Sequence, residues 1–171
     1  MHKAVKVWCS KIKGEFPEFF KRVNVLDVGS RDINGTNRYL FEDYKYTGID
    51  IMEGKNVDCV INPDVPVYGF ANSYDVVIST EMLEHDSTYA ESLKKMYKAL
   101  RHDGLLIVTA AGTKRKEHGT RESSPGDSPG TQDYYKNITV RMLCRGLSFA
   151  NFSWFEISYQ DKDIRFAGIK R

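Results

Sequence analysis

The chain has few cysteines, and their arrangement excludes two kinds of structure. Cys9, Cys59 and Cys144 are the three cysteines among 171 residues, and they are widely spaced with no paired-ligand pattern for a metal. Cys59 lies in a strand-like run and Cys144 in a helix-like run, so we expect buried free thiols. No disulfide framework and no metal site are expected, and a reducing, cytoplasmic setting follows.

An excess of charge and a long apolar run are also missing. The formal net charge is +2, which gives no general case for binding nucleic acid or a membrane. No apolar run approaches the length of a membrane span, and the first residues lack the apolar core of a signal peptide. With 41% apolar and 28% charged residues, the composition is ordinary for a globular protein, and we expect one domain over residues 1–171.

Glycines are missing where a dinucleotide site would need them. Such a site requires glycine at all three places of G-x-G-x-x-G, so that a pyrophosphate can lie on the end of a helix. Counting from Gly29, the other two places hold Arg31 and Asn34, with Asp32 between them. These side chains block the approach of phosphates and the carboxylate repels them, which counts against a nicotinamide dehydrogenase.

Two apolar runs that end in aspartate are present instead. The first apolar run, residues 24–28, ends in Asp27 and Val28 and is followed by Gly29. This pattern is typical of a buried parallel strand that leads into a tight turn. The second run ends at Asp50, roughly 20 positions beyond the first glycine, where a carboxylate can accept from ribose hydroxyls. The pattern predicts a nucleoside pocket at the carboxyl ends of two adjacent strands. S-adenosylmethionine fits it, because this nucleoside is cationic and carries no phosphate.

Three segments resemble the class I S-adenosylmethionine-dependent methyltransferases. They are residues 25–29, 48–50 and 74–85, and the last ends in Leu83, Glu84 and His85. The likeness is to the branch in which the fourth strand runs into a Leu-Glu-His segment, and it covers about residues 24 to 110. The chain departs from the family at positions 30 and 31, where a second glycine is usual.

The resemblance implies an α/β fold, a Rossmann-like three-layer sandwich. Its sheet is mostly parallel and seven-stranded, with one antiparallel strand in a C-terminal hairpin. Periodicity and turn signals predict strands at 24–28, 46–50, 57–62, 74–79, 105–110, 152–159 and 164–169. They predict helices at 3–13, 36–44, 89–100 and 139–146, with a capping box at 88–91 and a C-cap at 102–104. The first helix either packs on the sheet or serves as a lid or partner-binding arm.

The predicted cofactor residues come from the ends of the first four strands. In similar enzymes the position of Asp27 serves the methionine ammonium, often through water, and that of Asp50 the ribose; a strand-end aspartate such as Asp27 can also cap its own turn. An aspartate at the end of the third strand accepts from the adenine amino group there; Asn62 stands at that position and can accept as well, or merely begins an Asn-Pro turn. The full set is Asp27, Gly29, Ser30, Asp50, Ile51, Met52, Asn62, Thr80 and Glu81. Ile51 and Met52 lie against the adenine or belong to the core.

A long polar segment follows the fifth strand. Residues 112–133 are rich in Gly, Ser, Pro and charge, which predicts a flexible loop over the pocket side. The basic run at 114–116 contacts an acidic substrate or forms a solvated tip. His85 and His118 are the candidate proton acceptors, because imidazole titrates near neutral pH. His85 could instead orient the backbone or stack near the ligand, and Glu81 could contact the substrate.

These observations predict a methyltransferase that acts on an O or N nucleophile of a small molecule, such as a sugar or a biosynthetic intermediate. A nucleic-acid or protein substrate is the second hypothesis. It is disfavoured because residues 80–83 lack the Pro-Pro-aromatic segment of amino-methylating DNA enzymes. A non-catalytic S-adenosylmethionine-binding module is the third. Substrate recognition and oligomeric state are not readable from these residues.

Overall fold

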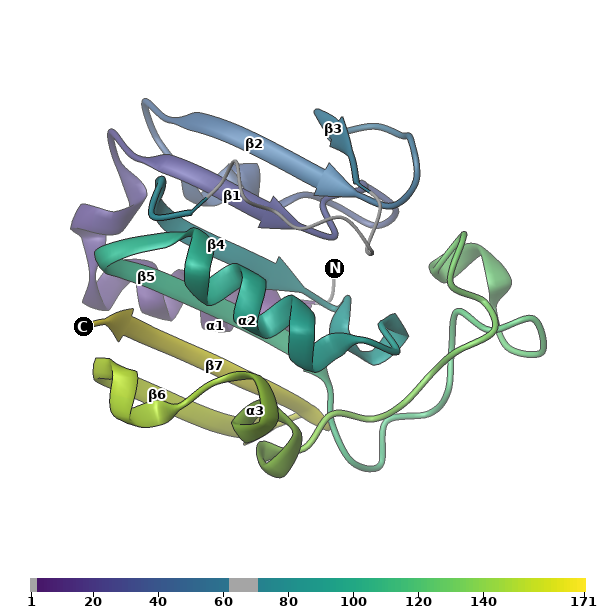
Figure 1. Ribbon diagram of the computed structural model, residues 1–171. Helices are drawn as coiled ribbons and strands as arrows, with labels where there is room; N and C mark the ends of the chain where they lie inside the picture. The colour runs from purple at the N-terminus through teal and green to yellow at the C-terminus, as the bar shows by residue number, and fades with distance from the viewer. Residues whose placement is uncertain (1–2, 62–70) are drawn as a thin grey trace.

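Seven strands form one sheet in the computed structural model, which describes residues 3–61 and 71–171 (Figure 1). Their order across the sheet is β3-β2-β1-β4-β5-β7-β6. The strands are β1 (Asn24–Val28), β2 (Lys45–Asp50), β3 (Cys59–Val60), β4 (Tyr74–Thr80), β5 (Leu100–Ala111), β6 (Phe152–Gln160) and β7 (Asp163–Lys170). The helices are α1 (Lys3–Glu15), α2 (Tyr89–Ala99) and α3 (Val140–Gly146).

The pairing of the strands confirms the predicted fold. The neighbours from β3 to β5 all pair in parallel, whereas β7 is antiparallel to both β5 and β6. The chain leaves β1 for β2 on one side and returns to β4 on the other. The carboxyl ends of these strands therefore flank a topological switch point, the place where open α/β sheets bind ligands.

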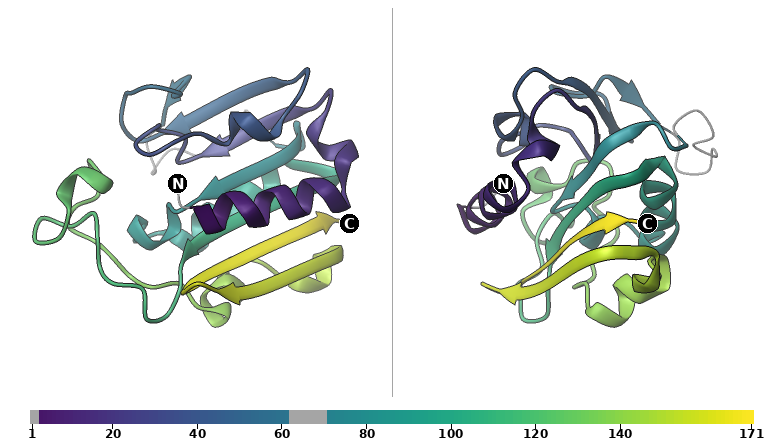
Figure 2. Two further views of the ribbon diagram at one scale, coloured as in Figure 1. Left: turned by 180° about the vertical axis from the view of Figure 1, so that it is seen from behind. Right: turned by 90° about the vertical axis from the view of Figure 1, so that its left-hand side faces the viewer.

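Helices cover both faces of the sheet, which gives three layers (Figure 2). Val76 and Ile78 of β4 belong to the core cluster that contains the buried residues of α1. Val77, between them, belongs to the cluster that contains α2 and α3. This alternation follows from the period of two along a strand. The predicted first helix therefore packs on the sheet.

Helix α2 begins at Tyr89 as expected, but neither the predicted capping box nor the predicted C-cap forms. The Thr88 hydroxyl donates to the Asp86 carboxylate (2.7 Å) and Glu91 pairs with Lys94 (2.7 Å), so no capping box forms. Asp86 also accepts from the backbone N–H of Thr88, and it therefore takes the hydroxyl that a capping box would use. The helix ends at Ala99, and the next residue already pairs in β5. The expected C-cap at 102–104 is thus part of a strand.

Two further expectations change with the structure. The short helix predicted at 36–44 is a single 3-10 turn, η2 (Asn37–Leu40), in which the Thr36 hydroxyl accepts from the N–H of Arg38 (3.2 Å). Cys59 and Cys144 are exposed, because Cys59 lies on the edge strand β3 and Cys144 on the outer side of α3; Cys9 alone is buried, and all three are free. Of the third strand only Cys59–Val60 forms. Asn62 and most of the connection that follows it lie outside the described residues.

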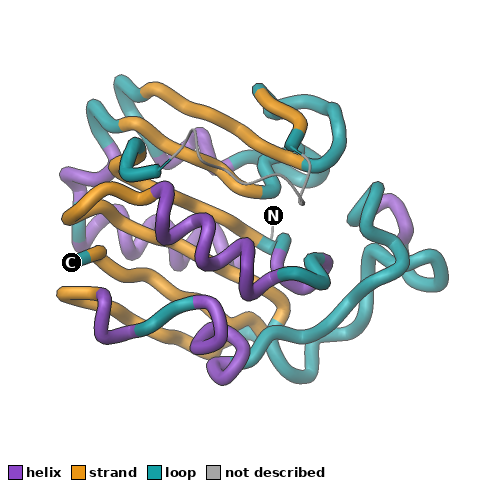
Figure 3. The backbone as a smooth tube through the Cα atoms, in the orientation of Figure 1, coloured by secondary structure: helices purple, strands orange, loops and turns teal. Residues whose placement is uncertain are grey.

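The predicted loop after β5 is present. Residues 112–139 leave the carboxyl end of β5 and extend past that edge of the sheet, with one 3-10 turn, η5 (Pro125–Asp127) (Figures 1 and 3). The loop ends at Thr139, whose hydroxyl accepts from the N–H of Met142 (3.3 Å) and begins α3 as expected. None of the described helices is long and apolar enough to span a membrane.

Candidate active site

A cavity of about 460 Å³ opens at the carboxyl ends of β1, β2 and β4. Most of the residues that we predicted from the sequence line it: Asp27, Gly29, Ser30, Asp50, Ile51, Thr80, Glu81 and His85. Met52 and His118 lie outside the lining, and Asn62 lies outside the described residues. The fold therefore brings together side chains from three strands that are up to 58 positions apart in the sequence, from Asp27 to His85.

Gly29 makes the bend at the end of β1. Its φ is +77°, and a Cβ atom at this position would lie 2.5 Å from Cγ of Met82. Only glycine fits such a position without strain. The N–H groups of Gly29 and Ser30 both donate to the carbonyl of Ile49 (2.9 and 3.1 Å), and the Ser30 hydroxyl donates to the carbonyl of Asn56. The bend is thus fastened to β2 and to the loop that follows it.

The Asp50 carboxylate is held by two backbone N–H groups. Oδ2 accepts from Arg31 (3.2 Å) and Oδ1 from Met52 (3.0 Å). A carboxylate has about four acceptor sites. Each oxygen therefore keeps a lone pair that can accept from a ligand hydroxyl.

Asp27 is buried within a small polar network. Its carboxylate accepts from the Tyr46 hydroxyl (2.6 Å) and from Nδ2 of Asn37 (3.3 Å), and Nδ2 also donates to the Thr80 hydroxyl (3.1 Å). Burial raises the pKa of Asp27 to about 6, partly offset by these two hydrogen bonds. Sequence reasoning missed Tyr46 and Asn37, since a strand tyrosine and a turn asparagine carry no local signal of a carboxylate partner.

Glu81 follows β4 in a left-handed conformation, with φ of 55°. One of its oxygens accepts from the Thr109 hydroxyl (3.0 Å), and the Arg115 guanidinium lies 3.9 Å from the other. Burial, and secondly the nearby carboxylate of Asp163, raise the pKa of Glu81 to about 7. Arg115 also pairs with Asp163 of β7. The middle residue of the basic run at 114–116 is therefore folded into the site, whereas Lys114 and Lys116 are exposed.

The rings of His85 and His118 pack edge to face, with centroids 5.1 Å apart, and both rings contact the ring of Tyr135. His85 lies in the 3-10 turn η4 (Leu83–His85) and is 6% exposed. Burial, followed by the nearby His118, lowers the pKa of His85 to about 4. The imidazole is therefore neutral at pH 7 and able to accept a hydrogen bond or a proton.

The loop after β5 covers part of the cavity. Asp127, Ser128 and Thr131 contribute to the lining. A Cβ atom at Gly130, where φ is +93°, would lie 2.7 Å from Cγ of Met52. Met52 is thus placed against the loop, and it is neither in the core nor in the cavity lining.

Comparison with known proteins agrees with this geometry. Residues 26–108 match the family model described as a methyltransferase domain, a segment that starts in β1 and ends in β5. No curated protein matches the chain. The family match and the fold support a class I S-adenosylmethionine-dependent methyltransferase, an enzyme whose cofactor is S-adenosylmethionine.

Several solved structures share the fold at low sequence identity. The Burkholderia thailandensis 1,6-didemethyltoxoflavin N1-methyltransferase is 15% identical, with a TM-score of 0.63 over 98% of this chain and 78% of its own. The Haemonchus contortus phosphoethanolamine N-methyltransferase 2 is 18% identical, with a TM-score of 0.63 over 95% of this chain and 52% of its own. The CurJ carbon methyltransferase is 14% identical, with a TM-score of 0.64 over 94% and 51%. The chain thus spans about half the length of the last two.

Proposed function

We propose that the chain transfers the methyl group of S-adenosylmethionine to an O or N nucleophile of a small molecule, such as a sugar or a biosynthetic intermediate. The observation that carries this proposal is a single cavity. It runs from the carboxylates of Asp27 and Asp50 to Glu81 and His85, partly beneath the loop after β5. Its volume is that of a small-ligand site.

The described residues fit the cofactor at the β1–β2 end. The free lone pairs of Asp50 suit the ribose hydroxyls, and the Gly29 bend lets the backbone come close. The buried Asp27 carboxylate suits the ammonium group at the methionine end of the cofactor. Burial disfavours the charged form of Asp27, and a bound cation would favour it again. Ser30, Ile51 and Thr80 line the same part of the cavity. Asn62 and Met52 stay predictions from the sequence.

When bound, S-adenosylmethionine supplies a methyl group whose bond to sulfur breaks as the bond to the acceptor atom forms, with the electron pair left on sulfur. The protein mainly has to align the acceptor, since effective molarities can reach roughly 10⁵ M or more. An uncharged oxygen or nitrogen must also lose its proton. A positioned acceptor for that proton contributes about 10²–10⁴-fold.

Two groups at the far end of the cavity can take the proton. His85 is neutral at pH 7, and the raised pKa of Glu81, about 7, is near the operating pH that favours a general base. His118 lies behind His85 and outside the cavity lining, so it would act by positioning the His85 ring. Two of the similar structures are named as N-methyltransferases and one as a carbon methyltransferase. The two N-methyltransferases support nitrogen as the acceptor atom, and the screen described below tests it.

The compartment is part of the same proposal. All three cysteines are free, including the two exposed ones. Free thiols persist in reducing compartments, which supports the cytoplasm.

Isothermal titration with S-adenosylhomocysteine tests the cofactor site. The change Asp50→Asn keeps the shape of the side chain but removes its charge and one acceptor oxygen, so we expect at least tenfold weaker binding with an unchanged melting temperature. Asp103→Asn is the matched control, because Asp103 is exposed in β5 before the strand enters the core. Equal affinity of Asp50→Asn and wild type would reject the assignment of Asp50.

A methyl-acceptor screen tests the substrate class. Formation of S-adenosylhomocysteine is measured with panels of small amines, phenols and sugars, and in parallel with RNA, DNA and protein. Turnover of a small molecule supports the proposal. Turnover of macromolecules alone would replace it with the second hypothesis.

A further inference from the structure

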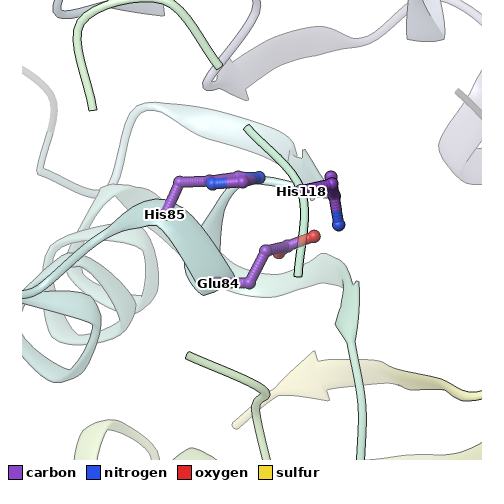
Figure 4. A group of neighbouring side chains, drawn as sticks. All are labelled: Glu84, His85 and His118. Carbon is purple, nitrogen blue, oxygen red and sulfur yellow. The ribbon is translucent and has the colours of Figure 1, made fainter. Parts of the chain in front are cut away.

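Glu84, His85 and His118 converge beside the cavity, and methyl transfer as described above gives no role to Glu84 (Figure 4). Glu84 and His85 come from η4, whereas His118 comes from the loop after β5. Each offers one atom that can bind a metal, and the three atoms lie within 4.8 Å of one another. The loop is also fastened here, because the N–H of Lys136 donates to the carbonyl of Glu84 (2.8 Å).

Two of these side chains have buried polar atoms that find no hydrogen-bond partner among the described residues. Glu84 is 0% exposed, and neither of its carboxyl oxygens has a partner among the described residues. Burial, and secondly Glu81, raise its pKa well above the ordinary value, although the nearby N–H groups of Glu84 and Ala111 oppose this. Nδ1 of His85 is likewise buried without a partner. Buried polar atoms normally have partners, so unpaired ones in a native fold require an explanation such as an ion.

His118 is oriented as a metal-binding histidine would be. Its Nδ1 lies 3.1 Å from the carbonyl of Lys116. A carbonyl only accepts hydrogen bonds, so Nδ1 carries the proton and Nε2 keeps a free lone pair. The Tyr135 hydroxyl donates to the same carbonyl (3.1 Å), and the Tyr135 ring packs against both histidine rings. A hydrogen bond from the second ring nitrogen is how proteins fix the tautomer of a metal-binding histidine.

We propose that Glu84, His85 and His118 bind a divalent transition metal, with zinc as the best match. Two imidazoles and one carboxylate are a known ligand set for zinc sites that keep a fourth position open. Magnesium and calcium prefer oxygen ligands and fit this set less well. Zinc ligands at about 2.0–2.1 Å lie about 3.3 Å apart in a tetrahedron, so the three atoms have to close by at most about 1.5 Å. His118 is on a loop and can supply this movement.

The bound metal would activate the methyl acceptor, and this role rests on the proposed function. His85 lines the cavity, so a metal bound to it lies at the acceptor end. A Lewis acid at that position lowers the pKa of an acceptor hydroxyl or amine. His85 is then a ligand, and the proton of the acceptor passes to Glu81. The metal would also tie the loop to η4 and so hold the loop over the cavity.

Zinc titration against a chromophoric chelator tests the site directly. We expect the full chain, stripped of metal, to bind one zinc ion. His118→Ala and Glu84→Gln should each weaken zinc binding at least tenfold. Loss of a residue that only supports a ligand typically costs about 10–100-fold in metal affinity, and loss of the ligand itself should cost no less. His102→Ala is the matched control and should bind as wild type, since His102 is exposed and pairs only with Asp103 among the described residues.

The outcomes separate this proposal from the methyltransferase assignment. His118→Ala alters the loop alone and should retain S-adenosylhomocysteine binding while losing zinc. Absence of zinc binding in the wild type, or unchanged affinity in His118→Ala, overturns the metal site and leaves the cofactor site standing. His85→Ala should lose both zinc and turnover. Loss of turnover with unchanged zinc affinity would show that His85 is the proton acceptor and would remove it from the ligand set.

Discussion

Buried carboxyl groups at the site lower the stability of the fold at neutral pH. Asp27, Glu81 and Glu84 all have raised pKa values, and burial is the largest cause in each case. Each group is therefore more easily protonated in the folded chain than in the unfolded chain. When these carboxyl groups are charged, their burial destabilises the folded state. A bound cationic ligand or metal ion would balance the charge and offset this destabilisation.

Glu81 gives a pH-dependent prediction for stability. Because its pKa rises from 4.5 to about 7 on folding, its favourable contribution is complete below about pH 4.5 and is lost as the pH rises through 7. Glu81→Gln keeps an acceptor for the Thr109 hydroxyl and cannot ionise. We expect it to stabilise the protein at pH 8 by on the order of 3 kcal/mol, with little change at pH 4.5, measured by urea unfolding.

The exposed Glu91 is the matched control for Glu81. Lys94 lowers the pKa of Glu91, and its side chain is in solvent, so Glu91→Gln should leave unfolding almost unchanged at both pH values. A gain in Glu81→Gln that is the same at pH 4.5 and pH 8 would show that charge is not its cause. If Glu81 accepts the proton of the substrate, the same variant is more stable and less active.

At the scale of elements, β2 and the loop after it must approach each other closely. The N–H of Gly48 donates to the Asp58 carboxylate (2.7 Å), and the N–H of Asp58 donates to the carbonyl of Gly48 (2.8 Å). A Cβ atom at Gly48 would lie 2.1 Å from the carbonyl oxygen of Asn56. This contact places the loop beside Asp50, so it supports the cofactor end of the cavity.

Alanine substitutions at Gly48 and Gly14 distinguish the effect of this close contact from the general effect of replacing a glycine. Gly48→Ala forces the backbone at Asn56 to move, so we expect a loss of at least about 2 kcal/mol in the free energy of unfolding. Gly14→Ala should stabilise the protein by up to about 1 kcal/mol, because Gly14 lies in α1 with nothing within 4 Å of the added carbon. Thermal and urea unfolding measure both. Equal effects would contradict the close contact.

At the scale of the whole molecule, the cavity joins elements that would otherwise be far apart. It is lined by the ends of three strands, by α2 and by the loop after β5. A ligand bound there contacts all of these elements at once. Binding should therefore stabilise the fold as a unit.

Thermal shift with two nucleotides tests this expectation. S-adenosylhomocysteine at 100 times its dissociation constant should add about 2.7 kcal/mol, which raises the melting temperature by roughly 5–10 °C for a chain of this length. NAD should give no shift, because Arg31 and Asp32 stand where its phosphates need open backbone. A shift with NAD and none with S-adenosylhomocysteine would contradict the family assignment in this chain.

The sequence by itself determined the strands and the edge of the sheet where ligands bind. Apolar runs that end in Asp27 and Asp50, and the segment that ends in His85, are local patterns, and parallel strands place such ends at one edge. It misjudged the boundary between α2 and β5, since strand pairing with Tyr74 outweighs the local C-cap signal.

Only the tertiary structure decided which side chains meet. Tyr46 beside Asp27, Arg115 beside Asp163, and His118 beside Glu84 depend on how strands register and on the path of the loop after β5. Residues 19 or more positions apart, as Asp27 and Tyr46 are, leave no periodic trace of such a contact. The raised pKa values of Asp27 and Glu84 depend in turn on burial, which is a property of the packed molecule and not of the local sequence.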